Sequence, residues 1–148
     1  LLNLVNEGIM CGQVSLSHGI FERKYKELKI YAFIHEGFSA VMDSIHSYFE
    51  ANMALLNCDV RQDLFNRSRP VFTKSRDDMP VKYGLKSDVS NSLIADGCVI
   101  KGTVKNSILF RGVKVEEGAV VENCVLMDDT KIGKNSKITN VCTVTGNR

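Results

Sequence analysis

The sequence predicts a mainly β fold, a left-handed parallel β-helix of hexapeptide repeats preceded by an α/β segment. Between Val89 and Val144, apolar residues recur every five or six positions with one step of four, and small residues precede most of them by two. Three such steps make one turn of 15 to 17 residues, and an Asn column repeats with the same period. This repetition is typical of solenoids, in which short strands of successive turns stack in parallel.

The apolar residues predicted to point into the coil all occupy the same position of the repeat. They are Val89, Ile94, Ile100, Val104, Phe110, Val115, Val121, Met127, Ile132, Ile138 and Val144. Asn suits the corners of a coil because it tolerates left-handed backbone angles and its amide can bond along the stack. The Asn column consists of Asn91, Asn106, Asn123 and Asn140. Glycines are predicted at other corners, namely Gly97, Gly102, Gly112, Gly118 and Gly133. The alternative, an antiparallel meander, requires two-residue alternation and hairpin turns.

Residues 1–57 have the pattern of α/β structure. A short helix is predicted from the leucines at the start to about Gly8, and the β-branched and aromatic segment 29–34 (KIYAFI) predicts a buried strand. Asp43 or Ser44 can cap a second helix. Its apolar face is Ile45, Tyr48, Phe49, Asn52, Met53 and Leu56. One strand and one helix are too little for a domain, so we expect this part to complete a sheet formed by a longer protein.

Residues 58–88 are predicted to connect this part to the β-helix at 89–148. Asp59 and Gln62 have capping-box spacing for one short helical turn, and residues 69–73 are predicted to be extended. The connector is locally basic, with Arg67, Arg69, Lys74, Arg76 and Lys82. These charges fit either a solvated linker or a site for an anionic effector.

Composition excludes several classes of protein. With 148 residues, 44% hydrophobic and 24% charged, the chain is long enough and apolar enough to bury a core. A net charge of +2 gives no electrostatic reason for binding nucleic acid or an anionic membrane. The sequence contains no apolar run long enough to span a membrane and does not open on a signal-peptide pattern.

The cysteines and histidines provide no metal site or general base. No Cys-x-x-Cys or Cys/His ligand spacing occurs, so reduced thiols in the cytoplasm are favoured over disulfides or metal ligands. The cysteines are Cys11, Cys58, Cys98, Cys124 and Cys142. A hexapeptide-repeat acyltransferase, one alternative function, uses a histidine of the coil as its base. All three histidines, His18, His35 and His46, precede the coil.

The chain resembles the C-terminal third of the glucose-1-phosphate adenylyltransferase family, which makes ADP-glucose for glycogen and starch. The resemblance extends from about Lys29 to Met127 and is carried by GFSAVMDSIHSYFEANMALL, RPVFTKSRDDMP and NSLIADGCVIKGTVKNSILFRGVKVEEGAVVENCVLM. Its most specific parts are residues 48–53 and 106–110. The family joins a Rossmann-like nucleotidyltransferase domain to a C-terminal left-handed β-helix. The resemblance therefore implies that residues 1–57 are the remnant of the nucleotidyltransferase domain.

One departure from the family pattern concerns catalysis. Catalytic members read Gly-Tyr-Trp-x-Asp-Val-Gly-Thr-Ile where this chain reads GFSAVMDSI, so Val41 occupies the position of the family's catalytic Asp. That Asp helps to hold metal and substrate phosphates, and a valine can do neither. The alternative is an alignment shifted by two, in which Asp43 substitutes. The pattern is similar to the GlgD type of companion subunit, which modulates an active partner.

The resemblance also implies partners and cofactors. The family is tetrameric, which implies a hetero-oligomer with a catalytic subunit, and the intact active enzyme uses ATP and Mg²⁺. No phosphate-binding G-x-x-x-x-G-K-[ST] or G-x-G-x-x-G motif occurs here, so we expect the chain alone to be inactive and to hold no cofactor. A second alternative function is a purely structural β-helix that mediates assembly through its faces and strand edges.

Overall fold

The computed structural model describes residues 2–73 and 76–143 of the chain. Two compact units are present, one ending at Glu36 and the other beginning at Gly37. This division differs from the predicted boundary at residue 57. Val144 of the predicted inward set and Lys74 of the basic connector lie outside the described residues.

The first unit is helical. It contains α1 (Leu2–Met10), the π-helix η1 (Leu16–Phe21) and α2 (Glu22–Lys24). The predicted first helix is thus confirmed and continues past Gly8. Gly8 allows η1 to pack closely, since a Cβ there would lie 2.7 Å from Cδ1 of Ile20, itself 7% exposed.

The predicted strand at 29–34 is wrong. These residues form no strand, and Tyr31, Phe33 and Ile34 are all more than four-fifths exposed. A strand needs a neighbour to satisfy its backbone groups. The described residues provide no such neighbour for this segment, so its β-rich composition has no sheet to join.

The second unit begins with two helices, α3 (Ile45–Ala54) and α4 (Cys58–Leu64). The predicted helix with Ser44 as its cap is confirmed, although it ends two residues before Leu56. The predicted turn near Asp59 is also helical, but Asn57 is its cap: the Asn57 side chain accepts a hydrogen bond from the Asp59 backbone N–H at 2.9 Å. The region between residue 58 and residue 88 therefore holds a helix as well as connecting chain.

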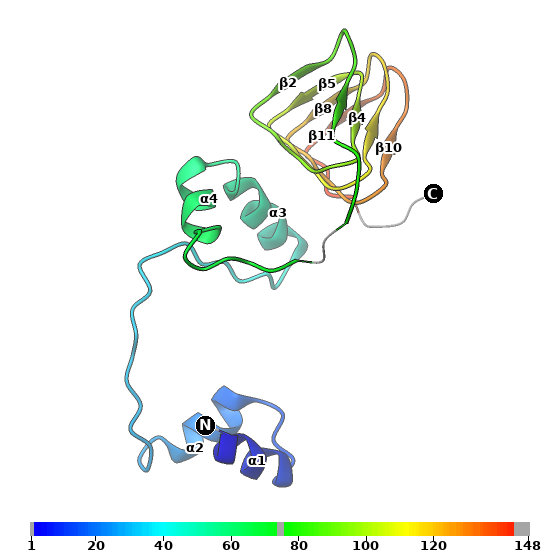
Figure 1. The fold of residues 1–148 in the computed structure, drawn as a ribbon. Coiled ribbons are helices and arrows are strands. Elements are labelled where there is room, and N and C mark those ends of the chain that lie inside the picture. The colour runs from blue at the N-terminus through cyan, green and yellow to red at the C-terminus, as the bar shows by residue number, and fades with distance from the viewer. Residues whose placement is uncertain (1, 74–75, 144–148) are drawn as a thin grey trace. The chain divides into compact units, whose positions relative to one another are not determined.

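The rest of this unit is a solenoid of short parallel strands, drawn from green to orange in Figure 1. Its strands form three sheets, in the orders β1-β4-β7-β10, β11-β8-β5-β2 and β3-β6-β9. The bounds are β1 (Lys82–Tyr83), β2 (Asp88–Ser90), β3 (Leu93–Ile94), β4 (Val99–Ile100), β5 (Thr103–Lys105), β6 (Ile108–Leu109), β7 (Lys114–Val115), β8 (Val120–Glu122), β9 (Val125–Leu126), β10 (Lys131–Ile132) and β11 (Lys137–Thr139). The predicted parallel β-helix is confirmed, and it begins earlier than residue 89, because β1 pairs with β4.

The core of the solenoid follows the predicted register on two of its three sheets. Ile100 pairs with Val115 and Val104 with Val121, and each of these side chains is at most 1% exposed. Each inward residue thus stacks on its counterpart in the next coil, which is the arrangement that removes most apolar surface from water.

On the third sheet the predicted register is wrong by one residue. Ile94 pairs with Leu109 and Leu109 with Leu126, and both leucines are at most 1% exposed. Phe110 and Met127, predicted to point inward, are only half-buried. Adjacent residues of a strand point to opposite faces, so Phe110 and Met127 belong to the outer side of the coil.

The predicted Asn column is confirmed. All four Asn residues have a positive φ, between 43° and 57°. The amide Nδ2 of Asn106 donates to Oδ1 of Asn123 at 3.0 Å, and Asn91 donates in the same way to Asn106. The column therefore supplies both the left-handed corner and a ladder of side-chain hydrogen bonds along the stack.

The predicted glycine corners are confirmed only in part. Gly97, Gly112 and Gly118 have a positive φ, whereas Gly102 and Gly133 are not among the positive-φ residues. Gly102 serves a different purpose, because a Cβ there would lie 2.3 Å from the carbonyl oxygen of Ala119 in the next coil. The backbones of the two coils approach closely at this point, and a residue without a side chain allows that approach.

Candidate functional site

The candidate site is the segment that leads from Gly37 into α3. It has no regular secondary structure before the cap of the helix, and Val41 is 79% exposed. The backbone N–H of Phe38 donates to Oδ2 of Asp63 at 2.6 Å, which ties the start of the segment to α4. Val41, which the sequence predicts at the position of the family's catalytic Asp, therefore presents an apolar side chain to solvent.

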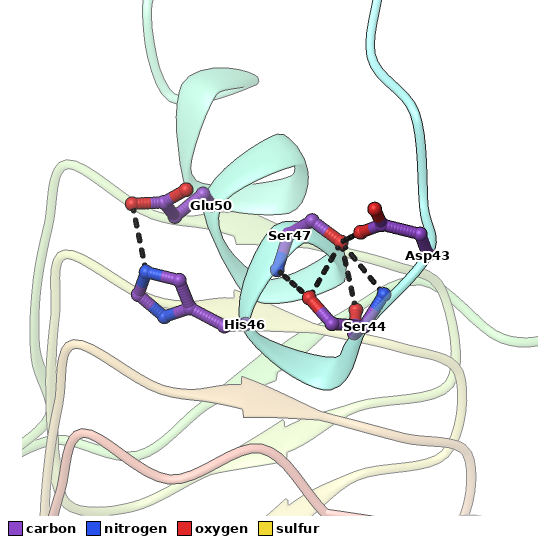
Figure 2. Close-up of polar contacts among 5 residues, drawn as sticks. All are labelled: Asp43, Ser44, His46, Ser47 and Glu50. Carbon is purple, nitrogen blue, oxygen red and sulfur yellow. Dashed lines mark hydrogen bonds and ion pairs between the residues drawn. The ribbon is translucent and has the colours of Figure 1, made fainter.

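Asp43, the carboxylate two residues after Val41 in the sequence, lies beside the cap of α3 (Figure 2). The N–H of Ser47 donates to Oγ of Ser44 at 3.1 Å, and the N–H of Ser44 donates to Oγ of Ser47 at 3.0 Å. This is a capping box with serine in place of the usual Glu or Gln. Ser47 Oγ lies 2.9 Å from Oδ1 of Asp43, to which it donates. Asp43 thus stabilises the positive end of the helix dipole.

His46 and His18 each contact a glutamate one helical turn away. His46 lies on the exposed side of α3, with Nε2 3.2 Å from Oε1 of Glu50 (Figure 2). His18 makes the same i,i+4 contact with Glu22 at 2.7 Å in the first unit. Exposed pairs of this kind contribute little to stability. Among the described residues, no group of three or more His, Cys, Asp or Glu side chains could hold a metal ion.

A mostly apolar groove of about 510 Å³ lies between the start of α3 and the third sheet. Tyr48 Oη donates to the sulfur of Met127 at 3.8 Å across it, and Asp43 and Thr143 are among its polar residues. Its described lining contains no lysine or arginine. The groove therefore offers no cation to a substrate phosphate, and its chemistry is that of a packing contact between α3 and the solenoid.

The described basic residues of the connector, which exclude Lys74, are exposed. Arg69 lies 3.8 Å from Asp63, Arg67 and Arg76 are exposed, and Lys82 lies on the outer side of β1. The predicted effector site remains a prediction.

None of the five cysteines is joined in a disulfide in this structure. Cys98 and Cys124 are fully buried, and burial raises the pKa of both thiols. Their Sγ atoms lie 3.1 Å from the carbonyl oxygens of Phe110 and Glu122, respectively. Neutral, hydrogen-bonded and inaccessible thiols are poor nucleophiles, so these two residues have a packing role.

Two features of this unit are not apparent from sequence reasoning. The first is the cover of the third sheet by α3, which explains why the outer residue Val125 is fully buried. The second is the charge on the first sheet, where Lys82, Lys114 and Lys131 occupy one outward register. Each of β7 and β10 has a lysine directly before its inward apolar residue, as in Lys114-Val115 and Lys131-Ile132, and this pattern could have revealed the second feature once the coils were aligned.

Comparison with known proteins supports the resemblance inferred from the sequence. Residues 79–146 match the family model described as GlmU-like, C-terminal hexapeptide. The chain is 41% identical over 97 residues to the glycogen biosynthesis protein GlgD of Bacillus subtilis, covering 66% of this chain and 28% of that protein. It is 54% identical over 71 residues to the GlgD of Geobacillus stearothermophilus, covering 48% of this chain and 21% of that protein.

A relative that carries the name of the enzyme has nearly the same sequence identity as the GlgD of Bacillus subtilis. The chain is 40% identical over 107 residues to the glucose-1-phosphate adenylyltransferase of Bacillus mycoides, covering 72% of this chain and 28% of that protein. The predicted resemblance is thus confirmed for this region. The chain spans between 21% and 28% of the length of these relatives. No helix in the described ranges has the length and apolar character needed to cross a membrane.

Proposed function

We propose that the intact protein is a companion subunit of glucose-1-phosphate adenylyltransferase in glycogen biosynthesis, with little or no catalytic activity of its own. The relatives named GlgD and those named glucose-1-phosphate adenylyltransferase both support a place in this reaction, which forms ADP-glucose from ATP and glucose 1-phosphate.

The observation that carries the proposal is the pair Val41 and Asp43. The resemblance places a metal- and phosphate-holding Asp at the position of Val41, and the valine is exposed and apolar. Phosphoryl transfer depends on neutralising and positioning charge, so this replacement removes a required group. Asp43 cannot readily take over, because its carboxylate accepts the hydrogen bond of Ser47 in the helix cap.

The proposal assigns different work to the two subunits. ATP, Mg²⁺ and glucose 1-phosphate bind the catalytic subunit. The companion subunit, acting in the cytoplasm, supplies its β-helix as a rigid body that packs against sister subunits of a hetero-tetramer. A stacked solenoid suits this role because every coil is fixed by the hydrogen bonds of its neighbours.

The experiment measures ADP-glucose formation by a catalytic subunit from the same organism, with and without the full-length companion protein. We expect the mixture to differ in rate or in its response to effectors. An equal added concentration of catalytic subunit, in place of the companion, is the control for total protein. A mixture whose rate and effector response equal those of the catalytic subunit alone would refute the proposal.

A further inference from the structure

The three outer faces of the solenoid differ in chemistry. The third sheet, β3-β6-β9, is apolar outside, and α3 contacts it at β9. The second sheet, β11-β8-β5-β2, carries charges of both signs. The first sheet, β1-β4-β7-β10, carries positive charge only. This last face has no role in the fold described above.

The positive face is formed by lysines in direct register. Lys82 pairs with Val99, Val99 with Lys114 and Lys114 with Lys131, and all three lysines are exposed. Neighbouring strands are about 4.8 Å apart, so Lys114 and Lys131 hold like charges side by side. Such a pair is destabilising in a sheet. Within residues 2–73 and 76–143, none of the three lysines makes an ion pair.

The second sheet shows that this arrangement is not general in the solenoid. There the outward residues include Asp88, Lys105, Glu122 and Lys137. Nζ of Lys105 lies 3.6 Å from Oδ2 of Asp88, and Lys105 is in register with Glu122. The second face is therefore charge-balanced, whereas the first is not.

The corner beside the first sheet strengthens the positive potential. Two glutamates lie at that corner: Glu116 accepts a hydrogen bond from Lys101 at 3.0 Å, and Glu117 lies 3.3 Å from Lys86. The Lys101 ammonium lowers the pKa of Glu116, and the charges of Lys134 and Lys114 lower it further. The first sheet and this corner together hold six lysines (Lys82, Lys86, Lys101, Lys114, Lys131 and Lys134) and two glutamates (Glu116 and Glu117), an excess of positive charge that is larger than the net charge of +2 on the whole chain.

We propose that the outer face of β1-β4-β7-β10 is a docking surface for an acidic face of the catalytic subunit. The occupant is identified by charge complementarity: carboxylates of a protein partner would relieve the unpaired, adjacent lysines. This inference rests on the proposed function, and it adds the surface and the chemistry of the contact. Electrostatic docking of this kind sets association rate and partner choice more than it sets total affinity.

The test compares two double variants of the full-length protein that change charge equally. Lys114→Gln with Lys131→Gln neutralises the positive face. Lys105→Gln with Lys137→Gln neutralises two lysines on the balanced face of the same solenoid. Binding to the catalytic subunit is measured at 50 and at 300 mM NaCl by surface-immobilised association kinetics, and thermal unfolding is recorded for each variant.

We expect the first variant to bind about tenfold more weakly at low salt, with a smaller dependence on salt, and the control to stay within about twofold of the wild type. Because the first variant removes a like-charge pair, its unfolding temperature should not fall. If both variants bind the catalytic subunit as strongly as the wild type does, this proposal alone is overturned. An equal loss of binding in the two variants would overturn it as well. A wild-type protein that does not associate at all would overturn the proposed function and this proposal together.

Discussion

Replacing Leu126 by alanine tests the register of the third sheet. Leu126 is fully buried and stacks on Leu109, whereas its neighbour Met127 is half-buried and lies on the outer side, against Tyr48. Sequence periodicity alone predicts the opposite, with Met127 in the core. The pair Leu126→Ala and Met127→Ala therefore distinguishes the two registers.

The expected magnitude follows from burial. Leu→Ala removes three carbon groups, at about 0.8 kcal/mol each for loss of apolar transfer, or about 2.4 kcal/mol in total. A tightly stacked coil cannot collapse into the space, so a cavity cost brings the loss in unfolding free energy to about 3–5 kcal/mol. Met127→Ala leaves the stack intact and removes a half-exposed side chain. We expect it to cost about half as much or less.

The assay is urea unfolding followed by circular dichroism, with the wild type and both variants measured under the same conditions. The midpoint for Leu126→Ala should be clearly the lowest of the three, with an unchanged slope. A Met127→Ala variant as destabilised as Leu126→Ala would refute the register, and with it the account of the outer face covered by α3.

Two further predictions concern a close backbone approach and an ion pair. Gly102→Ala should lower the unfolding free energy by about 2 kcal/mol or more, because its Cβ would lie 2.3 Å from a carbonyl oxygen of the next coil; an unchanged urea midpoint would contradict the short corner. Lys101→Gln should raise the pKa of Glu116 toward its ordinary value, as followed by NMR titration. Because the pKa of Glu116 is lowered in the folded wild type, the Lys101–Glu116 pair stabilises the fold at pH values above the unfolded-state pKa of Glu116. The difference in unfolding free energy between variant and wild type should therefore vanish as the pH falls through the lowered pKa. An unshifted titration in the variant would contradict this assignment.

The solenoid could be predicted from sequence because its signal is repeated. Each coil repeats the same apolar and Asn positions. The spacing of these positions therefore predicts the Asn column from Asn91 to Asn140 and the stacked core residues that begin at Ile100 and Val104. The third sheet could not be resolved in this way. Its strands contain adjacent apolar residues, as in Leu109 and Phe110, because one side faces the core and the other is packed outside. Periodicity cannot choose between two apolar neighbours.

The strand predicted at residues 29–34 does not form, for a different reason. Its composition favours a strand, but a strand forms only where another strand accepts its hydrogen bonds, and that condition is not a property of six residues. Tertiary context decides such segments. The same limit applies to α3, whose contact with β9 joins residues far apart in the chain.

The assignment of Val41 to the position of the family's catalytic Asp rests on the motif that surrounds it and stays a prediction. The hydrogen bonds beside Val41 could not be predicted from the sequence. The hydrogen bond from Ser47 to Asp43 depends on where α3 begins, and serine at the third helical position is a weak signal for a capping box. That contact argues against Asp43 as a substitute for the missing carboxylate.

The most direct test of the account is the activity of the full-length protein alone. The measurement is the initial rate of ADP-glucose formation from saturating ATP and glucose 1-phosphate with Mg²⁺, beside a catalytic relative at the same concentration. The account predicts a negligible rate, because the resemblance places the carboxylate that phosphoryl transfer needs at the position of the exposed Val41. A rate comparable to that of the catalytic relative would contradict it and would make this protein an ordinary catalytic subunit.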